Sequence, residues 1–172
     1  MSSMEINKIN GIDETNENLL EQLSTVLPYN FKLTSLKFDL QYHADIKVID
    51  ENGLIEYWLM RFRRHPYRDF TIRTSAKRYA SEFEKIYHGK SISKRYLHVI
   101  LDQNQSIKEA YIVNVKRLSQ MKLFLENILQ VQRKPNFVYI TPEQLIENNL
   151  VDIHVKTQGD NNGRLEVISR YK

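Results

Sequence analysis

The fold is decided by residues 36–63, which read LKFDLQYHADIKVIDENGLIEYWLMRFR. From Leu36 to Val48 apolar residues alternate with polar ones, and this period of two predicts a β-strand with one face on a core and one face free. The Asn52-Gly53 pair tolerates the positive φ angles of a tight turn, and Trp58–Arg63 alternates again. The stretch therefore predicts a long hairpin, with its arms at residues 31–50 and 54–65.

The length of the turn determines which side chains face each other across this hairpin. A two-residue loop at Asn52-Gly53 would pair Arg61 with Ala44 and mix charge into both faces. A three-residue loop that begins at Glu51 instead pairs Ala44 with Met60, which keeps the faces distinct. Because a one-residue slip inverts every side chain, the consistent pattern favours the second register. Its polar face then carries Gln41, His43, Asp45, Arg61 and Arg63, with Asp45 diagonal to Arg61.

The composition suits one globular intracellular domain. The chain has 172 residues, of which 41% are hydrophobic, and no cysteine, which excludes disulfides, thiolate zinc sites and a cysteine nucleophile. Residues 1–13 lack the apolar core of a signal peptide, and no apolar run approaches the ~18 residues of a membrane span. We therefore expect a cytoplasmic protein with no membrane association. Residues 1–13 are expected to be disordered, and residues 14–172 to form a single α/β domain with a C-terminal αβ and hairpin extension.

Positive charge is concentrated in the middle of the chain. The formal net charge is +4, but residues 61–95 contain eleven Lys or Arg against three acidic residues, a local charge of +8. Phosphate backbones are the commonest partner of such a field, and aromatic residues such as Tyr67 lie between the basic ones. A solvated face that only keeps the protein soluble is the alternative. The candidate nucleic-acid contacts are His43, Arg63, Arg64, Arg68, Arg73, Lys77 and Arg78.

The remaining patterns give the order of the elements. Apolar stripes behind capping residues predict helices at residues 15–27, 75–89 and 116–130 and from residue 142 onward. Strands are expected at residues 69–73, 96–101, 110–115 and 137–140, with a second hairpin around residues 161–163. A meander of strands followed by a crossover helix predicts an α/β fold, in which a mixed β-sheet built on the long hairpin is flanked by helices.

With this order of elements, residues 14–115 resemble the PD-(D/E)XK nuclease superfamily, the restriction-endonuclease-like nucleases, and in particular its phage and mobile-element members. The resemblance rests on an αβββαβ core and on one local pattern, His43-Ala44-Asp45-Ile46, a tight hairpin, then Leu59-Met60-Arg61-Phe62-Arg63. In that superfamily the first Asp binds Mg²⁺, and an acid and a lysine lie across the hairpin on the same face. Asp45 matches the Asp, Arg61 falls at the lysine, and Leu59 falls where the second acid belongs.

The resemblance implies a nuclease-like domain that uses Mg²⁺, with Mn²⁺ as a substitute. Asp45 would be a metal ligand and Arg61 would stabilise the phosphate of the transition state. The apolar residue at Leu59 departs from this scheme, because metal-assisted phosphodiester cleavage uses hard oxygen ligands, commonly two or more carboxylates. Asp69 and a glutamate of the first helix, Glu21 or Glu17, are the candidates for the missing metal ligands.

Two functions from different classes stay open at this stage. One is a Mg²⁺-dependent endodeoxyribonuclease with a degenerate active site. The other is a nuclease-like module that binds nucleic acid, DNA in preference to RNA, or docks onto a larger protein assembly without cutting. The alternative for Asp45 is an ion pair with Arg61 or Lys47 that only holds the hairpin in register and binds no metal. A homodimer or a protein partner is compatible with either.

Overall fold

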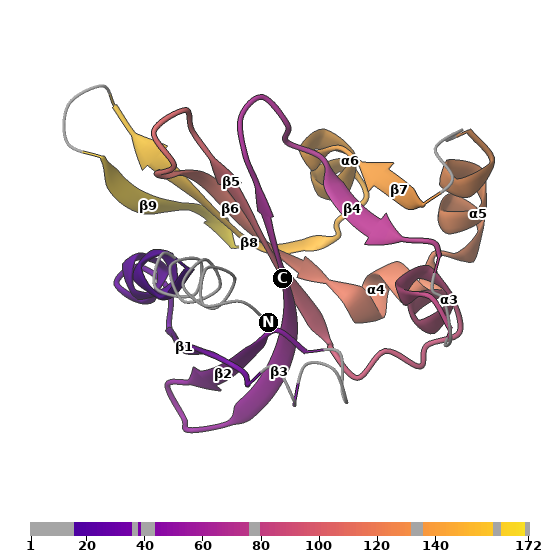
Figure 1. The fold of residues 1–172 in the computed structure, drawn as a ribbon, viewed down its shortest axis with the longest axis horizontal. Coiled ribbons are helices and arrows are strands. Elements are labelled where there is room, and N and C mark those ends of the chain that lie inside the picture. Colours follow the sequence, from indigo (N-terminus) through magenta and orange to yellow (C-terminus); the bar gives the residue numbers. More distant parts are fainter. Residues whose placement is uncertain are drawn as a thin grey trace, which may run out of the picture.

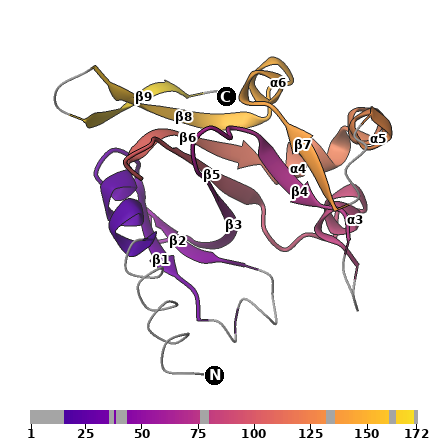
Figure 2. The ribbon, with the colours of Figure 1, turned by 45° about the horizontal axis from the view of Figure 1, so that its top comes forward.

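The computed structural model describes residues 16–35, 38, 44–75, 80–131, 136–159 and 163–170. It confirms the mixed α/β class. A seven-stranded mixed sheet contains, in spatial order, β1 (Tyr29–Leu33), β2 (Ile46–Asp50), β3 (Ile55–Arg63), β5 (Arg95–Leu101), β6 (Ile107–Asn114), β8 (Val151–Gln158) and β9 (Arg164–Arg170). A separate two-stranded sheet pairs β4 (Phe70–Arg73) with β7 (Phe137–Ile140). Figure 2 shows that the large sheet is curled, like half of a barrel.

The hairpin of β2 and β3 has the predicted register. Ile46 pairs with Trp58, and Gly53 in the turn has a φ of +79°. The turn is held by Asp50, whose Oδ1 accepts hydrogen bonds from the backbone N–H groups of Asn52, at 2.9 Å, and Leu54, at 2.8 Å. Local turn chemistry therefore fixes which side chains meet across these strands.

The prediction that the first arm of that hairpin is one strand over residues 31–50 is wrong. This arm contains two antiparallel strands, β1 and β2, with Phe31 opposite Val48. Both strands direct their apolar side chains to the same core, so the alternation does not reveal the reversal between them. Residues 36, 37 and 39–43, which include His43, lie outside the described part of the chain.

Two excursions leave the large sheet and meet on one of its faces. Residues 64–94 carry β4 and α3 (Glu82–Tyr87) between the parallel neighbours β3 and β5. Residues 115–150 carry α4 (Val115–Gln120), α5 (Lys122–Val131), β7 and α6 (Pro142–Glu147) between β6 and β8. β4 and β7 lie side by side and pair antiparallel (Figure 1). The strand expected at 69–73 thus exists, but it belongs to the small sheet.

Each face of the large sheet covers its own core. On the first face, a helix at residues 16–24 packs Leu20 and Leu23 against Trp58, which is 1% exposed. On the second face, Phe70 and other apolar side chains of the two excursions pack over Tyr96 and the sheet residues next to it. β5 contributes to both cores, which confirms the prediction of a strand buried on both sides.

Helix boundaries depart from the prediction in three places, of which the first is the helix expected at 15–27, which ends at residue 24. The helix expected at 75–89 is α3, which begins behind Ser81: the Ser81 hydroxyl accepts a hydrogen bond from the Glu84 N–H at 3.2 Å, and the Glu84 carboxylate accepts one from the Ser81 N–H at 2.6 Å. The helix expected at 116–130 is broken at Met121 into α4 and α5. α6 starts after Thr141 as predicted. Among the described helices, none is long and apolar enough to cross a membrane.

Candidate functional site

Asp45 and Arg61 lie on the second face of the sheet, and Arg61 also contacts a carboxylate from α3. Arg61 Nη2 donates a hydrogen bond to Glu82 Oε1 at 2.7 Å, and Arg61 Nη1 lies 3.9 Å from Asp45 Oδ2. The guanidinium also lies over the ring of Tyr96, 5.6 Å from its centroid. Burial opposes the charge on Arg61, but Tyr96, Glu82 and Asp45 together outweigh it and raise the pKa of Arg61. One guanidinium therefore contacts both carboxylates.

Both carboxylates also accept hydrogen bonds from other donors. Asp45 Oδ2 accepts from the Met60 N–H at 2.6 Å. Glu82 Oε2 accepts from the Arg73 N–H at 2.8 Å, and Glu82 Oε1 accepts from the Tyr96 hydroxyl. Burial raises the pKa of Tyr96 well above its usual value, so this hydroxyl keeps its proton and remains a donor. The cluster of Asp45, Arg61, Glu82 and Tyr96 is hereafter called the Arg61 cluster.

The Arg61 cluster does not fit the Mg²⁺ site that the resemblance implies. Leu59, at the position of the second acid, is 7% exposed and packs in the second core. Glu21 belongs to the helix at 16–24, which packs on the opposite face of the sheet. Within the described ranges, which include Asp45, Asp69 and Glu21, no three His, Asp or Glu side chains are placed to hold a metal ion together. Mg²⁺ needs several hard oxygen ligands, whereas these carboxylates contact a guanidinium.

A second polar cluster continues along the same face. Arg61, His98, Tyr111 and His154 are cross-strand neighbours in β3, β5, β6 and β8. The Tyr111 ring stacks on that of His154 with a centroid distance of 4.3 Å, and its hydroxyl donates a hydrogen bond to Glu109. Burial lowers the pKa of His98 to about 4, so the ring is neutral at pH 7 and its Nε2 can donate to the Arg68 carbonyl, 2.8 Å away. The imidazole thereby holds the connection between β3 and β4 against the sheet.

Several of the basic residues in the segment 61–95 are neutralised by carboxylates. Arg68 contacts Glu109 at 3.2 Å and Glu143, also at 3.2 Å. Arg95 contacts Glu56 at 2.7 Å and Asp152 at 2.9 Å. Most of the carboxylates that pair with Arg61, Arg68 and Arg95 lie outside the segment. The positive electrostatic field of residues 61–95 is therefore weaker than the sequence count of +8 suggests.

Arg63 is the last residue of β3, and Arg64 begins the connection of residues 64–69 between β3 and β4, which projects at the top of Figure 1. The Tyr67 N–H donates to the Arg64 carbonyl at 3.0 Å and closes a turn, and the Arg63 guanidinium lies 5.5 Å from the centroid of the Tyr67 ring. Tyr67 is 63% exposed. The ion pairs among the described residues involve neither Arg63 nor Arg64.

Of the other candidate contacts, Arg73 is exposed at the end of β4. Lys77 and Arg78 fall, like His43, outside the residues that the structure describes. The structure therefore places Arg63, Arg64 and Tyr67 near one another, and it pairs the partly exposed Arg68 with Glu109 and Glu143.

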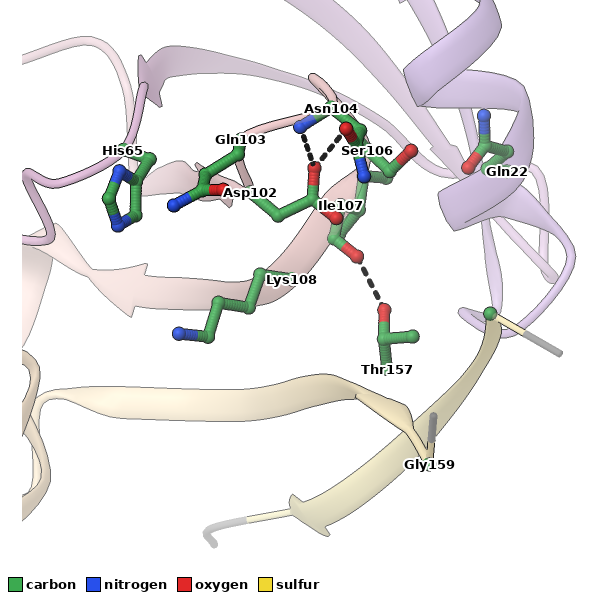
Figure 3. A pocket seen from close by; sticks show the side chains of 11 residues that line it. Gln22, His65, Asp102, Gln103, Asn104, Ser106, Ile107, Lys108, Thr157 and Gly159 are labelled. Atoms are coloured by element: carbon green, nitrogen blue, oxygen red, sulfur yellow. Dashed lines mark hydrogen bonds between the residues drawn. The ribbon is translucent and has the colours of Figure 1, made fainter. Parts of the chain in front are cut away.

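A surface depression of about 610 Å³ lies beside this connection (Figure 3). It is lined by His65, by the turn between β5 and β6, and by Lys108. Asp102 Oδ1 shapes that turn, because it accepts hydrogen bonds from the N–H groups of Asn104, at 2.8 Å, and Ser106, at 3.0 Å. The depression thus offers polar side chains near the exposed Arg64 and the partly buried Arg63.

Glu82 and Glu109 are the carboxylates of these two clusters that the sequence analysis did not select, and it did not select the rings of Tyr96, His98, Tyr111 and His154 either. For Glu82 the available signal was the pattern Ser81-x-x-Glu84, a capping box that places the start of a helix one residue before Glu82. For Glu109 the signal was a charged residue within the apolar run of β6, at a position that alternates with Tyr111. No model of a known protein family matches this chain, and no curated protein sequence matches it.

Proposed function

We propose that this protein is a nucleic-acid-binding module, for DNA in preference to RNA, with a restriction-endonuclease-like core of phage or mobile-element type. It grips the phosphate backbone through the connection between β3 and β4 and does not cut it. Arg63 and Arg64 supply the charge at this connection, and Tyr67 supplies an exposed aromatic surface.

The contact of Arg61 with both Asp45 and Glu82 supports binding over cleavage. A guanidinium stays protonated at every pH at which proteins are folded, so it compensates the two carboxylates permanently and cannot activate water as a base. A metal ion at this place would have to displace Arg61 and leave its charge partly buried without a partner, which is strongly unfavourable.

Salt dependence tests the phosphate contacts. Fluorescence anisotropy with a labelled DNA duplex at several NaCl concentrations gives the slope of log K against log salt, which falls by about 0.9 for each phosphate contact. We expect Arg63→Ala and Arg64→Ala each to make that slope shallower by about 0.9. Lys32→Ala is the control, because Lys32 is an exposed cation on the edge strand β1, away from the connection (Figure 1). Affinity that is flat across salt, or an equal change with the control, would contradict the proposal.

Cleavage has its own assay. Supercoiled DNA incubated with the protein and Mg²⁺ or Mn²⁺ should remain intact. Metal-dependent nicking by the wild type that disappears in Asp45→Ala would show that the nuclease reading was the correct one.

A further inference from the structure

We propose that Tyr67 stacks on an unpaired base, so that the preferred ligand is single-stranded nucleic acid or DNA that contains unpaired nucleotides. This inference rests on the proposed function and specifies its substrate class. It goes beyond phosphate contacts, which do not read the bases themselves.

Tyr67 presents an aromatic ring to solvent. At 63% exposed it is the one aromatic residue among the exposed large hydrophobic residues of the described ranges. Its backbone is fixed by the 3.0 Å hydrogen bond from its N–H to the Arg64 carbonyl, and the Arg63 guanidinium lies over one face of its ring, which leaves the other face for a base. The ring is therefore held in a defined place while most of its surface remains in water.

The neighbours of this ring favour a base as its partner. Arg63 and Arg64 lie within four residues of Tyr67 and can contact the phosphates on either side of a nucleotide whose base reaches the ring. An aromatic ring stacks on the face of any base, and combining such rings with cations is the common design of single-strand binding surfaces. In a duplex the base faces are covered by their stacking neighbours, so the ring would find only sugar and groove edges.

The adjoining depression supports the same ligand. His65 lies two residues before Tyr67 and lines the depression together with Asn104 and Lys108 (Figure 3). A strand that leaves Tyr67 in this direction meets an imidazole, an amide and an ammonium group, which can hydrogen-bond to base edges and to phosphate oxygens. Base edges are available for such contacts when the strand is unpaired.

The test compares one labelled oligonucleotide, single-stranded and as a duplex, by fluorescence anisotropy. Tyr67→Ala should weaken binding of the single strand by about 5- to 150-fold, the range for loss of one base–aromatic stack, and change duplex binding by less than about twofold. Tyr67→Phe keeps the ring and should bind the single strand like the wild type. Arg64→Ala, which removes a phosphate contact, should weaken both forms. Quenching of 2-aminopurine in the single strand should be present with the wild type and lost with Tyr67→Ala.

The outcomes separate the two proposals. An equal loss for single strand and duplex with Tyr67→Ala, or a Tyr67→Phe variant as weak as Tyr67→Ala, would overturn the stacking inference and leave the proposed function standing. A wild-type protein that binds neither form would overturn both. Because Tyr67 is largely exposed, its variants are expected to fold, and their circular dichroism spectra should match that of the wild type.

Discussion

Glu82→Ala is the most informative perturbation of the Arg61 cluster, because this carboxylate accepts hydrogen bonds from three donors. Its removal leaves the Tyr96 hydroxyl and the Arg73 N–H without this acceptor. Arg61 then retains Asp45 as its carboxylate partner, at 3.9 Å. The change therefore tests whether the cluster on which the proposed function rests is a stabilising unit.

The expected magnitude follows from burial. A hydrogen bond to a charged group contributes about 1.5–3 kcal/mol, and removing one partner of a fully buried ion pair costs about 3–5 kcal/mol. The side chains of Arg61 and Glu82 are 25% and 14% exposed, so water can replace part of what is lost. We expect the free energy of unfolding to fall by about 2–4 kcal/mol in Glu82→Ala. In Glu82→Gln, which keeps an acceptor oxygen, it should fall by about half as much.

Urea unfolding followed by the fluorescence of Trp58, the single tryptophan, measures this loss. With an m-value of about 2 kcal/mol/M, the midpoint of Glu82→Ala should fall by about 1–2 M. Glu147→Ala is the matched control, since Glu147 is an exposed helical glutamate of α6, and its effect should stay within about 0.5 kcal/mol. If Glu82→Ala unfolded at the same urea concentration as this control, the Arg61 cluster would contribute nothing and the reasoning would be refuted.

Three further changes test individual features of the fold. His98 has a pKa of about 4 in the folded protein, below its usual 6.5, so as the pH falls the unfolded chain takes up the proton before the folded protein does. The free energy of unfolding should therefore fall by up to roughly 3 kcal/mol between pH 6.5 and pH 4. In His98→Gln, the urea midpoints measured across this range should depend less on pH. An equally steep fall in the variant would assign the pH dependence to other groups. Ser81→Ala removes the cap of α3 and should lower the free energy of unfolding by about 1 kcal/mol in the same assay; an unchanged midpoint would show that the capping hydrogen bond is dispensable. Gly53→Ala places a Cβ at a φ of +79° with no atom within 4 Å, so a lowered thermal midpoint equivalent to about 1 kcal/mol is expected from backbone strain alone, and a midpoint at or above that of the wild type would contradict it.

The hairpin shows what the sequence could and could not predict about the fold. The pairing of Ile46 with Trp58 was predictable because the turn at Asp50–Leu54 is local, and its residue types define its geometry. The division of the first arm into β1 and β2 was not predictable from alternation. Phe31 and Val48 face the same core, and only their long-range pairing reveals that the chain reverses between them.

The candidate site divides in the same way. The proximity of Asp45 and Arg61 followed from the hairpin register, which is a local property. The contact between Arg61 and Glu82 depends on where the first excursion folds back, and Arg68 meets Glu109 across 41 residues. Such contacts are set by the packing of β4 and α3 on the sheet, which no period in the sequence encodes. The sequence therefore predicted the site least well where the contacting residues are farthest apart along the chain.

The pairing of β4 with β7 limits when the small sheet can form during synthesis of the chain. β4 ends at Arg73, and the strand that covers its edge begins at Phe137. At a synthesis rate of about 5–20 residues per second, β4 waits on a nascent chain for roughly 3–13 s before its partner exists. During that interval Phe70 and Ile72, which are fully buried in the finished protein, lack the part of their core that Val138 and Ile140 of β7 supply. Translation that stops before residue 137 leaves an open strand edge of the kind that recruits other chains.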